Sequence, residues 1–256
     1  MGRIHEARRL LKLPRYKPFN SQGVKNIGDG LVAVFDVDGT LTPVADSWRY
    51  YHKALGTWDQ AKRHAELFFS GAIDYLEWAR LDVGLWRGVS ASRIAELAGS
   101  IPWRSGAWNL SRLKELGYTL IAITTGIWEL ASRTLAELGF DYVLANELEV
   151  VEGRLTGGVK VNVEYWGKGG ALRRLLERLG IRPVLLVSVG DGGPDVEMFR
   201  MSDVAVAFNP WSQEVRAEAD LCVSSDSLAP IIKLLTSLAF SAKKVIKAYS
   251  FKTRRI

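Results

Sequence analysis

The chain has 256 residues, of which 48% are hydrophobic and 24% are charged, and its formal net charge is +6. This composition is typical of a folded globular protein and excludes a disordered, a collagen-like or a low-complexity chain. The single cysteine, Cys222, excludes an internal disulfide and a cysteine-based zinc site. We find no apolar stretch long enough for a membrane span and no secretory signal, and we therefore expect a soluble, cytoplasmic protein.

The positive charge is concentrated at the two ends of the chain. Residues 1–27 contain seven basic residues and one acidic residue, and residues 240–256 contain six basic and no acidic residues. Residues 28–239 contain 21 basic and 27 acidic residues, the opposite of what a nucleic-acid-binding core requires. We interpret the ends as a basic N-terminal extension and a basic C-terminal tail, either solvated arms or a C-terminal helix lying on the body. The alternative is electrostatic association with RNA, an anionic membrane or an acidic partner.

Apolar runs rich in β-branched residues, each bounded by turn residues, predict buried parallel strands. They are Leu31–Phe35, Thr119–Ile123, Tyr142–Leu144, Val184–Val189 and Val204–Phe208. Helical periodicity that ends at a C-cap glycine predicts helices over Trp108–Leu116, Trp128–Leu138 and Lys168–Leu179. This alternation predicts a doubly wound α/β fold with a parallel sheet, and Glu147–Lys160 predicts a β-hairpin beside it.

The stretch between the first two strands, residues 46–102, contains helical patterns but no convincing strand. The predicted helices are Trp48–Leu55, Trp58–Phe69, Asp74–Asp82 and Ser92–Ala98, the last with an N-cap near Ser90 or Ala91. Because a crossover between strands needs far fewer residues, we expect a small helical subdomain here. The α/β core would then comprise residues 28–45 and 103–239.

Two predicted strands end in pairs of carboxylates. The first is followed by Asp36-Val37-Asp38-Gly39-Thr40, and the strand Val184–Val189 by Gly190-Asp191-Gly192-Gly193-Pro194-Asp195. A turn explains Asp38-Gly39 but not Asp36, which directly follows an apolar strand. Open α/β sheets bind ligands at the carboxyl ends of their strands. Carboxylates gathered there repel one another unless a cation lies among them, and hard oxygen ligands suit Mg²⁺ shared with a phosphate.

Two further segments suit a phosphate. The strand Thr119–Ile123 ends in Thr124-Thr125-Gly126, which places hydroxyl and N–H groups before a predicted helix. Lys168 opens another predicted helix, and its ammonium group can neutralise phosphate charge. The alternative for Lys168 is a solvated side chain in a first helical turn, where the helix dipole does not favour a cation.

The ordered set Asp36-Val37-Asp38-Gly39-Thr40, Thr124, Lys168 and Gly190-Asp191-Gly192-x-x-Asp195 resembles the four motifs of the haloacid dehalogenase (HAD) superfamily. The segment from Asn146 to Gly157, followed by Lys168-Gly169, resembles more narrowly the phosphoserine phosphatase branch in its archaeal form. The resemblance covers about residues 30–230. It implies a Rossmann-like core of the HAD type, with residues 46–102 as a helical cap over the site.

The resemblance also implies a Mg²⁺-dependent phosphatase that hydrolyses a small phosphorylated metabolite through an aspartyl-phosphate. Asp36 would be the nucleophile, and Asp38 the general acid and later the base for water. Asp36, the backbone carbonyl of Asp38 and Asp191 would hold Mg²⁺, with Asp195 supporting that shell. The phosphate-binding groups would be Thr124, Thr125, Gly126 and Lys168, of which Thr124 and Lys168 would also stabilise transition-state charge.

Substrate contacts depart from the pattern of the phosphoserine phosphatases. Ala45 stands where an acidic residue contacts the substrate amine, Asp82 stands where an arginine contacts the carboxylate, and Pro194 replaces an asparagine. These departures leave the phosphatase chemistry intact and the identity of the substrate open. Candidate contacts from the cap are Asp46, Trp48, Arg49, Tyr50, His52, Arg80 and Arg87, although Trp48 and Tyr50 also suit the cap core. We interpret His52 and His64 as surface or packing residues and Cys222 as a buried small hydrophobe.

Two other functions remain open. The first is a phosphotransferase that passes the phosphoryl group to an acceptor alcohol, although an aspartate at position 38 favours hydrolysis because it can activate water. The second is a non-enzymatic protein that binds nucleic acid or a membrane through its basic ends. The complete set Asp36, Asp38, Thr124, Lys168 and Asp191 argues against the second.

Overall fold

The computed structural model describes residues 29–253, with side chains from 30 to 244. The predicted N-terminal extension, residues 1–27, therefore lies outside the described residues, as do residues 254–256. Among the described residues, no helix combines the length and the hydropathy that a membrane span requires.

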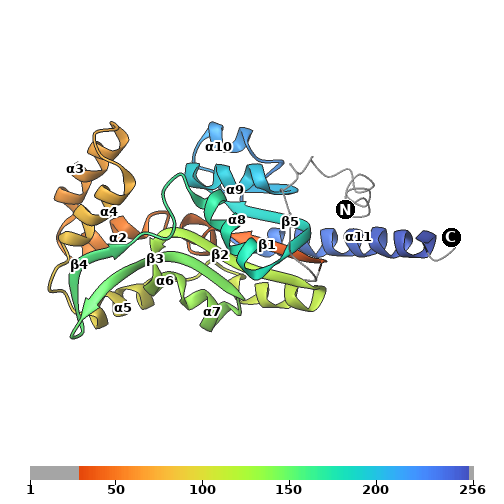
Figure 1. Ribbon diagram of the computed structural model, residues 1–256, viewed down its shortest axis with the longest axis horizontal. Coiled ribbons are helices and arrows are strands. Elements are labelled where there is room, and N and C mark those ends of the chain that lie inside the picture. Colours follow the sequence, from red (N-terminus) through yellow and green to blue (C-terminus); the bar gives the residue numbers. More distant parts are fainter. Residues whose placement is uncertain (1–28, 254–256) are drawn as a thin grey trace.

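The described residues form a seven-stranded sheet with the order β4-β3-β2-β1-β5-β6-β7 (Figure 1). The strands are β1 (Asp29–Phe35), β2 (Tyr118–Ile127), β3 (Tyr142–Val151), β4 (Arg154–Lys160), β5 (Arg182–Gly190), β6 (Val204–Phe208) and β7 (Leu221–Val223). Only the β3–β4 pair is antiparallel, and it forms the predicted hairpin. The prediction of a doubly wound α/β fold is confirmed.

Alternate residues of β1 face two separate apolar cores. Leu31, Ala33 and Phe35 belong to a core completed by the 3₁₀ helix η2 (Ala107–Leu116) and by α11 (Ala229–Thr253). Val32 and Val34 belong to a second core, on the face covered by α8 (Lys168–Leu179) and α9 (Val196–Met201). Because both faces of β1 are buried, its sequence is a continuous apolar run. This run is the pattern from which the strand was predicted.

The helices that follow the strands match the sequence unevenly. The predicted helix Lys168–Leu179 is confirmed as α8, and Trp108–Leu116 forms the 3₁₀ helix η2. The prediction of one helix over Trp128–Leu138 is wrong, because the chain forms two short helices, α6 (Trp128–Ala131) and α7 (Arg133–Leu138). The remaining elements are η1 (Val37–Leu41), η3 (Gly193–Asp195) and α10 (Gln213–Ala217).

The four α-helices between β1 and β2 lie at one end of the molecule (Figure 1). They are α2 (Ser47–Ala54), α3 (Trp58–Phe69), α4 (Tyr75–Gly84) and α5 (Ala91–Ser100), close to the four predicted helices. Asp46, Asp74 and Ser90 accept hydrogen bonds from backbone N–H groups as N-caps of α2, α4 and α5. Hereafter we call these four helices the cap.

The cap is paired to the edge of the sheet through its main chain. The N–H of Gly88 donates to the carbonyl of Leu155 on β4 (2.8 Å), and the N–H of Leu155 donates to the carbonyl of Val89 (2.9 Å). One residue further on, Ser90 and Arg154 form an antiparallel bridge. The hairpin β3–β4 therefore extends the sheet as far as the cap.

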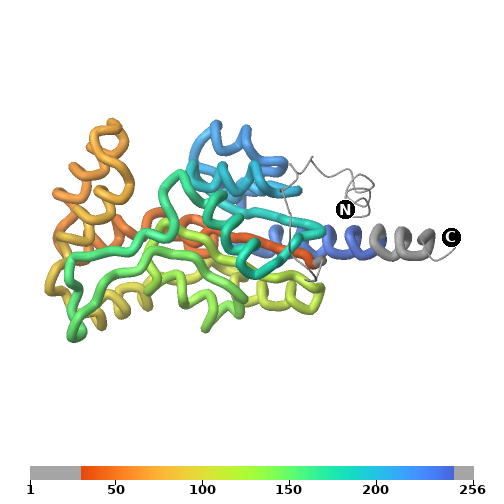
Figure 2. The backbone as a smooth tube through the Cα atoms, viewed as in Figure 1, coloured from red at the N-terminus to blue at the C-terminus, as the bar shows by residue number. Residues whose placement is uncertain are grey.

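The basic residues from 240 onward begin inside a helix. The 25-residue α11 crosses this position without a break, and it buries Ile231, Leu235, Ala239 and Ala242 at helical spacing. The coloured part of this helix in Figure 2 runs away from the cap, which lies at the opposite side of the molecule. The C-terminal segment was predicted to be either a solvated arm or a helix, and residues 240–253 are helical.

Cys222 is exposed, so the prediction that it is buried is wrong. It lies on β7, a three-residue strand that was not predicted and that pairs with β6 at the edge of the sheet. An edge strand this short leaves its side chains open to solvent, although its sequence, Leu-Cys-Val, resembles that of a core strand.

Candidate active site

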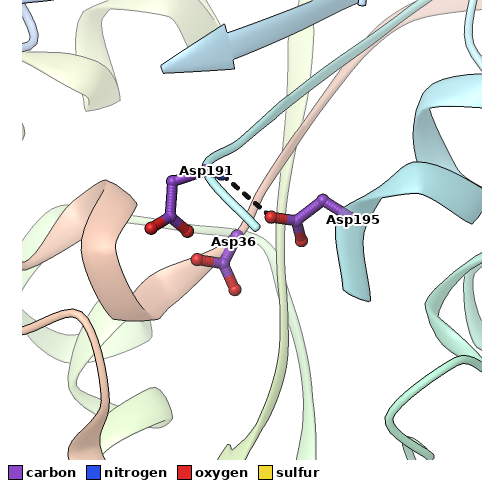
Figure 3. A group of neighbouring side chains, drawn as sticks. All are labelled: Asp36, Asp191 and Asp195. Carbon is purple, nitrogen blue, oxygen red and sulfur yellow. Dashed lines mark hydrogen bonds between the residues drawn. The ribbon is translucent and has the colours of Figure 1, made fainter. Parts of the chain in front are cut away.

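The carboxyl ends of β1 and β5 bring three aspartates together. Asp36 directly follows β1, and its N–H donates to the carbonyl of Val189 (2.9 Å), which fixes it beside the end of β5. Asp191 and Asp195 come from the loop after β5. One carboxylate oxygen from each of the three aspartates lies within 4.8 Å of the others (Figure 3). Hard oxygen ligands gathered in this way are the donors that Mg²⁺ prefers.

A glycine allows the first loop to close on the second. Gly39 has φ = +74°, and a Cβ at this position would collide with the carboxylate of Asp191. Arg104, from the segment after the cap, holds the same loop by donating to the carbonyls of Gly39 (2.6 Å) and Thr40 (2.9 Å). The role of Arg104 has no signal in the sequence, because it depends on a contact between residues 64 positions apart.

Lys168 bridges two of the three clustered aspartates. It is only 2% exposed, and its Nζ donates to Asp36 Oδ1 (2.5 Å) and to Asp195 Oδ1 (2.6 Å). The alternative of a solvated lysine is therefore wrong. The other oxygen of Asp195 accepts the N–H groups of Asp191 and Gly192, both at 2.9 Å, and Figure 3 draws the first of these bonds. Asp195 thus ties the loop after β5 to the lysine.

The electrostatics of the cluster favour an additional cation. Burial raises the pKa of Asp36 to about 8; Lys168 opposes this rise, and repulsion by Asp195 and Asp38 adds to it. Burial and then repulsion by Asp36 raise the pKa of Asp191 to about 9. Asp36 Oδ2 is buried and has no hydrogen-bond partner among the described residues. The charge balance and this unpartnered oxygen both fit a divalent cation held by the cluster.

The side chain of Asp38 lies outside that cluster and faces the cap. Its Oδ2 accepts hydrogen bonds from the hydroxyl (2.6 Å) and the N–H (3.1 Å) of Ser47, the first residue of α2. Burial raises the pKa of Asp38 to about 6, and the hydrogen bonds from Ser47 oppose the rise. Asp38 therefore holds a proton more readily than an exposed aspartate does, as a general acid requires. Ser47 was not predicted as a site residue, because its contact with Asp38 joins positions on separate elements.

The end of β2 adds the predicted threonines. Thr124 is buried, and its Oγ1 accepts the N–H of Gly126 at 2.9 Å. A Cβ on Gly126 would lie 3.1 Å from Thr124 Oγ1 and 3.2 Å from Ser47 Oγ, so the glycine permits a close approach of β2 to the cap. Thr124 and Gly126 lie within β2, which extends to Ile127. The helix predicted after them begins beyond the strand as α6, which has only four residues.

The carbonyl of Thr125 joins the cap to the core. It accepts Trp48 Nε1 (3.1 Å) and the Tyr75 hydroxyl (3.0 Å) from the cap, and Asn146 Nδ2 (2.9 Å) from β3. Trp48 was predicted as a substrate contact or as cap core, and this bond places it between the two units. Tyr75 was not predicted as a site residue, because its bond to Thr125 spans 50 positions in the chain.

A cavity of about 370 Å³ connects these groups to the cap. The predicted site residues that line it are Asp36, Asp38, Thr124, Thr125, Lys168, Asp191 and Asp195 from the core, and Asp46, Trp48, Arg49 and His52 from the cap. Three predicted substrate contacts are not among its lining residues. Arg80 and Arg87 are exposed, and the hydroxyl of Tyr50 is bonded to Ser100 Oγ (2.7 Å).

Helical geometry explains why Arg80 is excluded. The face of α4 toward the cavity carries Tyr75, Trp78, Ala79 and Asp82, at the spacing i, i+3, i+4 and i+7. Arg80 lies about 100° around the helix from Ala79 and therefore leaves that face. The periodicity of α4 was a signal in the sequence that pointed to this face.

Asp82, which stands where the resemblance expects an arginine, is buried and paired within the cap. Its carboxylate lies 2.7 Å from His64 Nδ1 and 3.3 Å from His52 Nε2. The indole of Trp86 donates to His52 Nδ1 at 3.1 Å. His52 is thus a buried packing residue that also lines the cavity.

Comparison with known proteins identifies the family. The family model of the haloacid dehalogenase-like hydrolases matches residues 33–200. A phosphoserine phosphatase of Idiomarina loihiensis is 32% identical over 208 residues, which cover 80% of this chain and 93% of that protein. A phosphoserine phosphatase of Archaeoglobus fulgidus is 31% identical over 214 residues, covering 83% of this chain. The chain spans 62% of the A. fulgidus protein and 50% of a similar one from Streptomyces coelicolor.

Solved structures agree with this similarity. A phospho-aspartyl intermediate analogue of phosphoserine phosphatase is 26% identical with a TM-score of 0.69, and the match covers 81% of this chain and 99% of that one. A substrate-bound phosphoserine phosphatase complex is 25% identical with a TM-score of 0.68 and the same coverage. With the sheet, the aspartate cluster and the buried lysine in place, these matches show that the chain belongs to the haloacid dehalogenase-like hydrolase family.

Proposed function

We propose that the protein is a Mg²⁺-dependent phosphomonoesterase that hydrolyses a small phosphorylated metabolite through an aspartyl-phosphate on Asp36. The observation that carries this proposal is the buried Lys168, which donates to Asp36 and Asp195 beside an unpartnered oxygen of Asp36. A buried lysine between two carboxylates is costly for stability alone, and perturbed groups of this kind are concentrated at functional sites. The names of the relatives support the same reaction class.

In the first half of the reaction, a carboxylate oxygen of Asp36 attacks the phosphorus of the ester, and the bond from phosphorus to the leaving oxygen breaks. Asp38 donates its proton to that oxygen, and the alcohol departs. Ser47 keeps the Asp38 carboxyl oriented through its hydroxyl and its N–H. The Lys168 ammonium and the Thr124 hydroxyl stabilise the charge on the phosphoryl oxygens.

In the second half, Asp38 takes a proton from water, and the water oxygen attacks the phosphorus. The bond between phosphorus and Asp36 breaks, which restores the carboxylate and releases inorganic phosphate. Bound Mg²⁺ would supply positive charge to the phosphoryl group throughout, and Asp36, Asp191 and the supporting Asp195 are the side chains that would hold it. The cap residues that line the cavity would limit the access of other water to the phosphorus.

The test is phosphate release from 4-nitrophenyl phosphate by the wild type and by Asp36→Asn. We expect the variant and the chelator-treated wild type to be inactive, because both lose the charge that the reaction requires. Asp59→Asn, an exposed aspartate of α3, serves as the matched control and should retain activity. Acid quenching followed by peptide mass spectrometry should find the phosphoryl group on Asp36. Full activity of Asp36→Asn would refute the assignment, and products phosphorylated on an added alcohol would identify a phosphotransferase instead.

A further inference from the structure

The part of the cavity that the cap supplies has apolar walls. α3 contributes Trp58, Ala61, Ala65 and Phe69, which follow one face of the helix. α4 contributes Tyr75, Trp78 and Ala79 ahead of the buried Asp82. Apolar walls with a few polar groups are typical of sites that bind the body of a small molecule.

The aromatic rings of this wall fix one another in place. The ring of Trp78 is stacked on Phe68 with centroids 4.6 Å apart, and it meets the ring of Phe69 edge-on at 5.6 Å. Tyr165, from the segment before α8, packs against Trp78 at 5.9 Å and against Phe69 at 5.6 Å. These contacts hold the rings against one another at the cavity wall, and the alanines between them add little bulk. The apolar volume is therefore formed before any ligand binds.

Charged groups on the cap side offer little to a charged leaving group. Asp82 is engaged by His64 and His52. Arg49 is exposed, and its guanidinium lies 5.0 Å from the centroid of the Trp58 ring. Asp46 accepts the N–H of Arg49 at 2.9 Å, and burial raises the pKa of its carboxyl, which disfavours the charged form that an ammonium group would need. An ion pair with the exposed Arg49 is screened by solvent and contributes little, whereas apolar burial contributes with every carbon enclosed.

From these observations we infer that the leaving group of the substrate is an uncharged alcohol with an apolar body larger than the serine side chain. The body would lie between α3 and α4 while the phosphoryl group lies at the aspartate cluster. This inference rests on the proposed phosphatase function and assigns its substrate class. The rival is a zwitterionic leaving group of the amino-acid type, held by Arg49 and Asp46.

The test is the hydrolysis of linear n-alkyl phosphates from ethyl to octyl, compared with L-phosphoserine. The alcohols of this series differ little in intrinsic reactivity, so changes in kcat/KM report on binding in the cavity. We expect about a fourfold gain in kcat/KM for each methylene until the cavity is full, which corresponds to about 0.8 kcal/mol per buried CH₂ at 1.36 kcal/mol per tenfold. We expect hexyl phosphate to exceed both ethyl phosphate and L-phosphoserine by on the order of a hundredfold.

Variants of the wall locate the effect. Ala65→Leu fills part of the cavity and should lower the ratio of kcat/KM for hexyl over ethyl phosphate by roughly tenfold. Trp58→Ala removes apolar surface from the wall without inserting a larger side chain, and it should lower the same ratio. It replaces Ala65→Leu as the test if that variant does not fold. Ala95→Leu, on the exposed face of α5, is the matched control and should leave the ratio unchanged.

The outcomes separate the two proposals. A flat response to chain length, or a preference for L-phosphoserine that Arg49→Ala removes, would overturn the inference and leave the phosphatase function standing. Failure to hydrolyse 4-nitrophenyl phosphate and every alkyl phosphate would overturn the proposed function itself. A rise with chain length that Ala65→Leu and Trp58→Ala reduce would support the inference.

Discussion

Replacing Lys168 with methionine tests how the buried charges are balanced. The substitution keeps most of the apolar stem but removes the ammonium group that bonds to Asp36 and Asp195 at 2.5 and 2.6 Å. The side chains of Lys168, Asp36 and Asp195 are at most 5% exposed, so solvent cannot replace the lost charge. With one positive charge removed, one of the clustered carboxyls must take up a proton for the charge to balance again.

The cost of that proton depends on pH. In the unfolded chain an aspartate has a pKa of about 3.9, so keeping it protonated at pH 7 costs about 4 kcal/mol, at 1.36 kcal/mol for each pH unit. At pH 5 the same protonation costs about 1.5 kcal/mol. The larger figure agrees with the roughly 3–5 kcal/mol found when one partner of a buried ion pair is removed. We therefore expect Lys168→Met to destabilise the protein by about 4 kcal/mol at pH 7 and by about 1.5 kcal/mol at pH 5.

Urea unfolding of the chelator-treated wild type and variant at the two pH values measures both figures. Lys160→Met is the matched control, because Lys160 pairs with Glu147 on the exposed hairpin at 2.9 Å and its side chain is 67% exposed. We expect the control to change the free energy of unfolding by about 0.5 kcal/mol or less at either pH. A destabilisation of Lys168→Met that does not change between pH 5 and pH 7 would refute the charge-balance argument.

Three further outcomes follow from the same site. Gly39→Ala should lose at least tenfold in kcat/KM, because its methyl group would meet the Asp191 carboxylate. Gly56→Ala is the control and should retain activity, because Gly56 also has a positive φ but has open space around it. Steady-state kinetics of the two variants measures the difference. Ser47→Ala should lower kcat by roughly tenfold with little change in KM, because Asp38 loses a hydrogen bond to a charged group; an unchanged kcat would contradict this role. In metal-free protein, burial raises the pKa of Asp36 to about 8 and that of Asp191 to about 9, above the pKa of an aspartate in the unfolded chain. The folded state therefore binds more protons, and its stability should fall as pH rises from about 4 towards 8. Thermal unfolding across that range should show this slope, and millimolar Mg²⁺ should flatten it; a slope of the opposite sign would contradict the assignment.

The elements that could be predicted from the sequence are those in which the local pattern of residues agrees with a single kind of structure. Leu31–Phe35 is apolar throughout because both faces of β1 are buried, and the acids that follow it interrupt that pattern visibly. Lys168–Leu179 was identified because its spacing and its C-cap glycine agree with one helix. The spacing of the apolar residues in α3 likewise predicted a helix, but it did not show that one face of this helix lines the cavity.

What the sequence could not supply depends on contacts between distant segments. Ser47 reaches Asp38 only because α2 begins beside the end of β2, and Arg104 reaches the loop at Gly39 from beyond the cap. Arg80 was predicted as a substrate contact, but the turn of α4 directs it to solvent. Cys222 has the neighbours of a core residue in the sequence but lies on a strand at the edge of the sheet.

The main-chain pairing of the cap with β4 also bears on how a substrate enters. Since the N–H of Gly88 donates to Leu155 and the N–H of Leu155 donates to Val89 across this junction, the cap cannot swing away from the hairpin as a free lid. Detaching it is a local unfolding event that exposes these two amides to solvent. Their rates of hydrogen–deuterium exchange therefore report how often the junction opens, and exchange far slower than turnover would mean that substrate and product pass through a cap that stays attached.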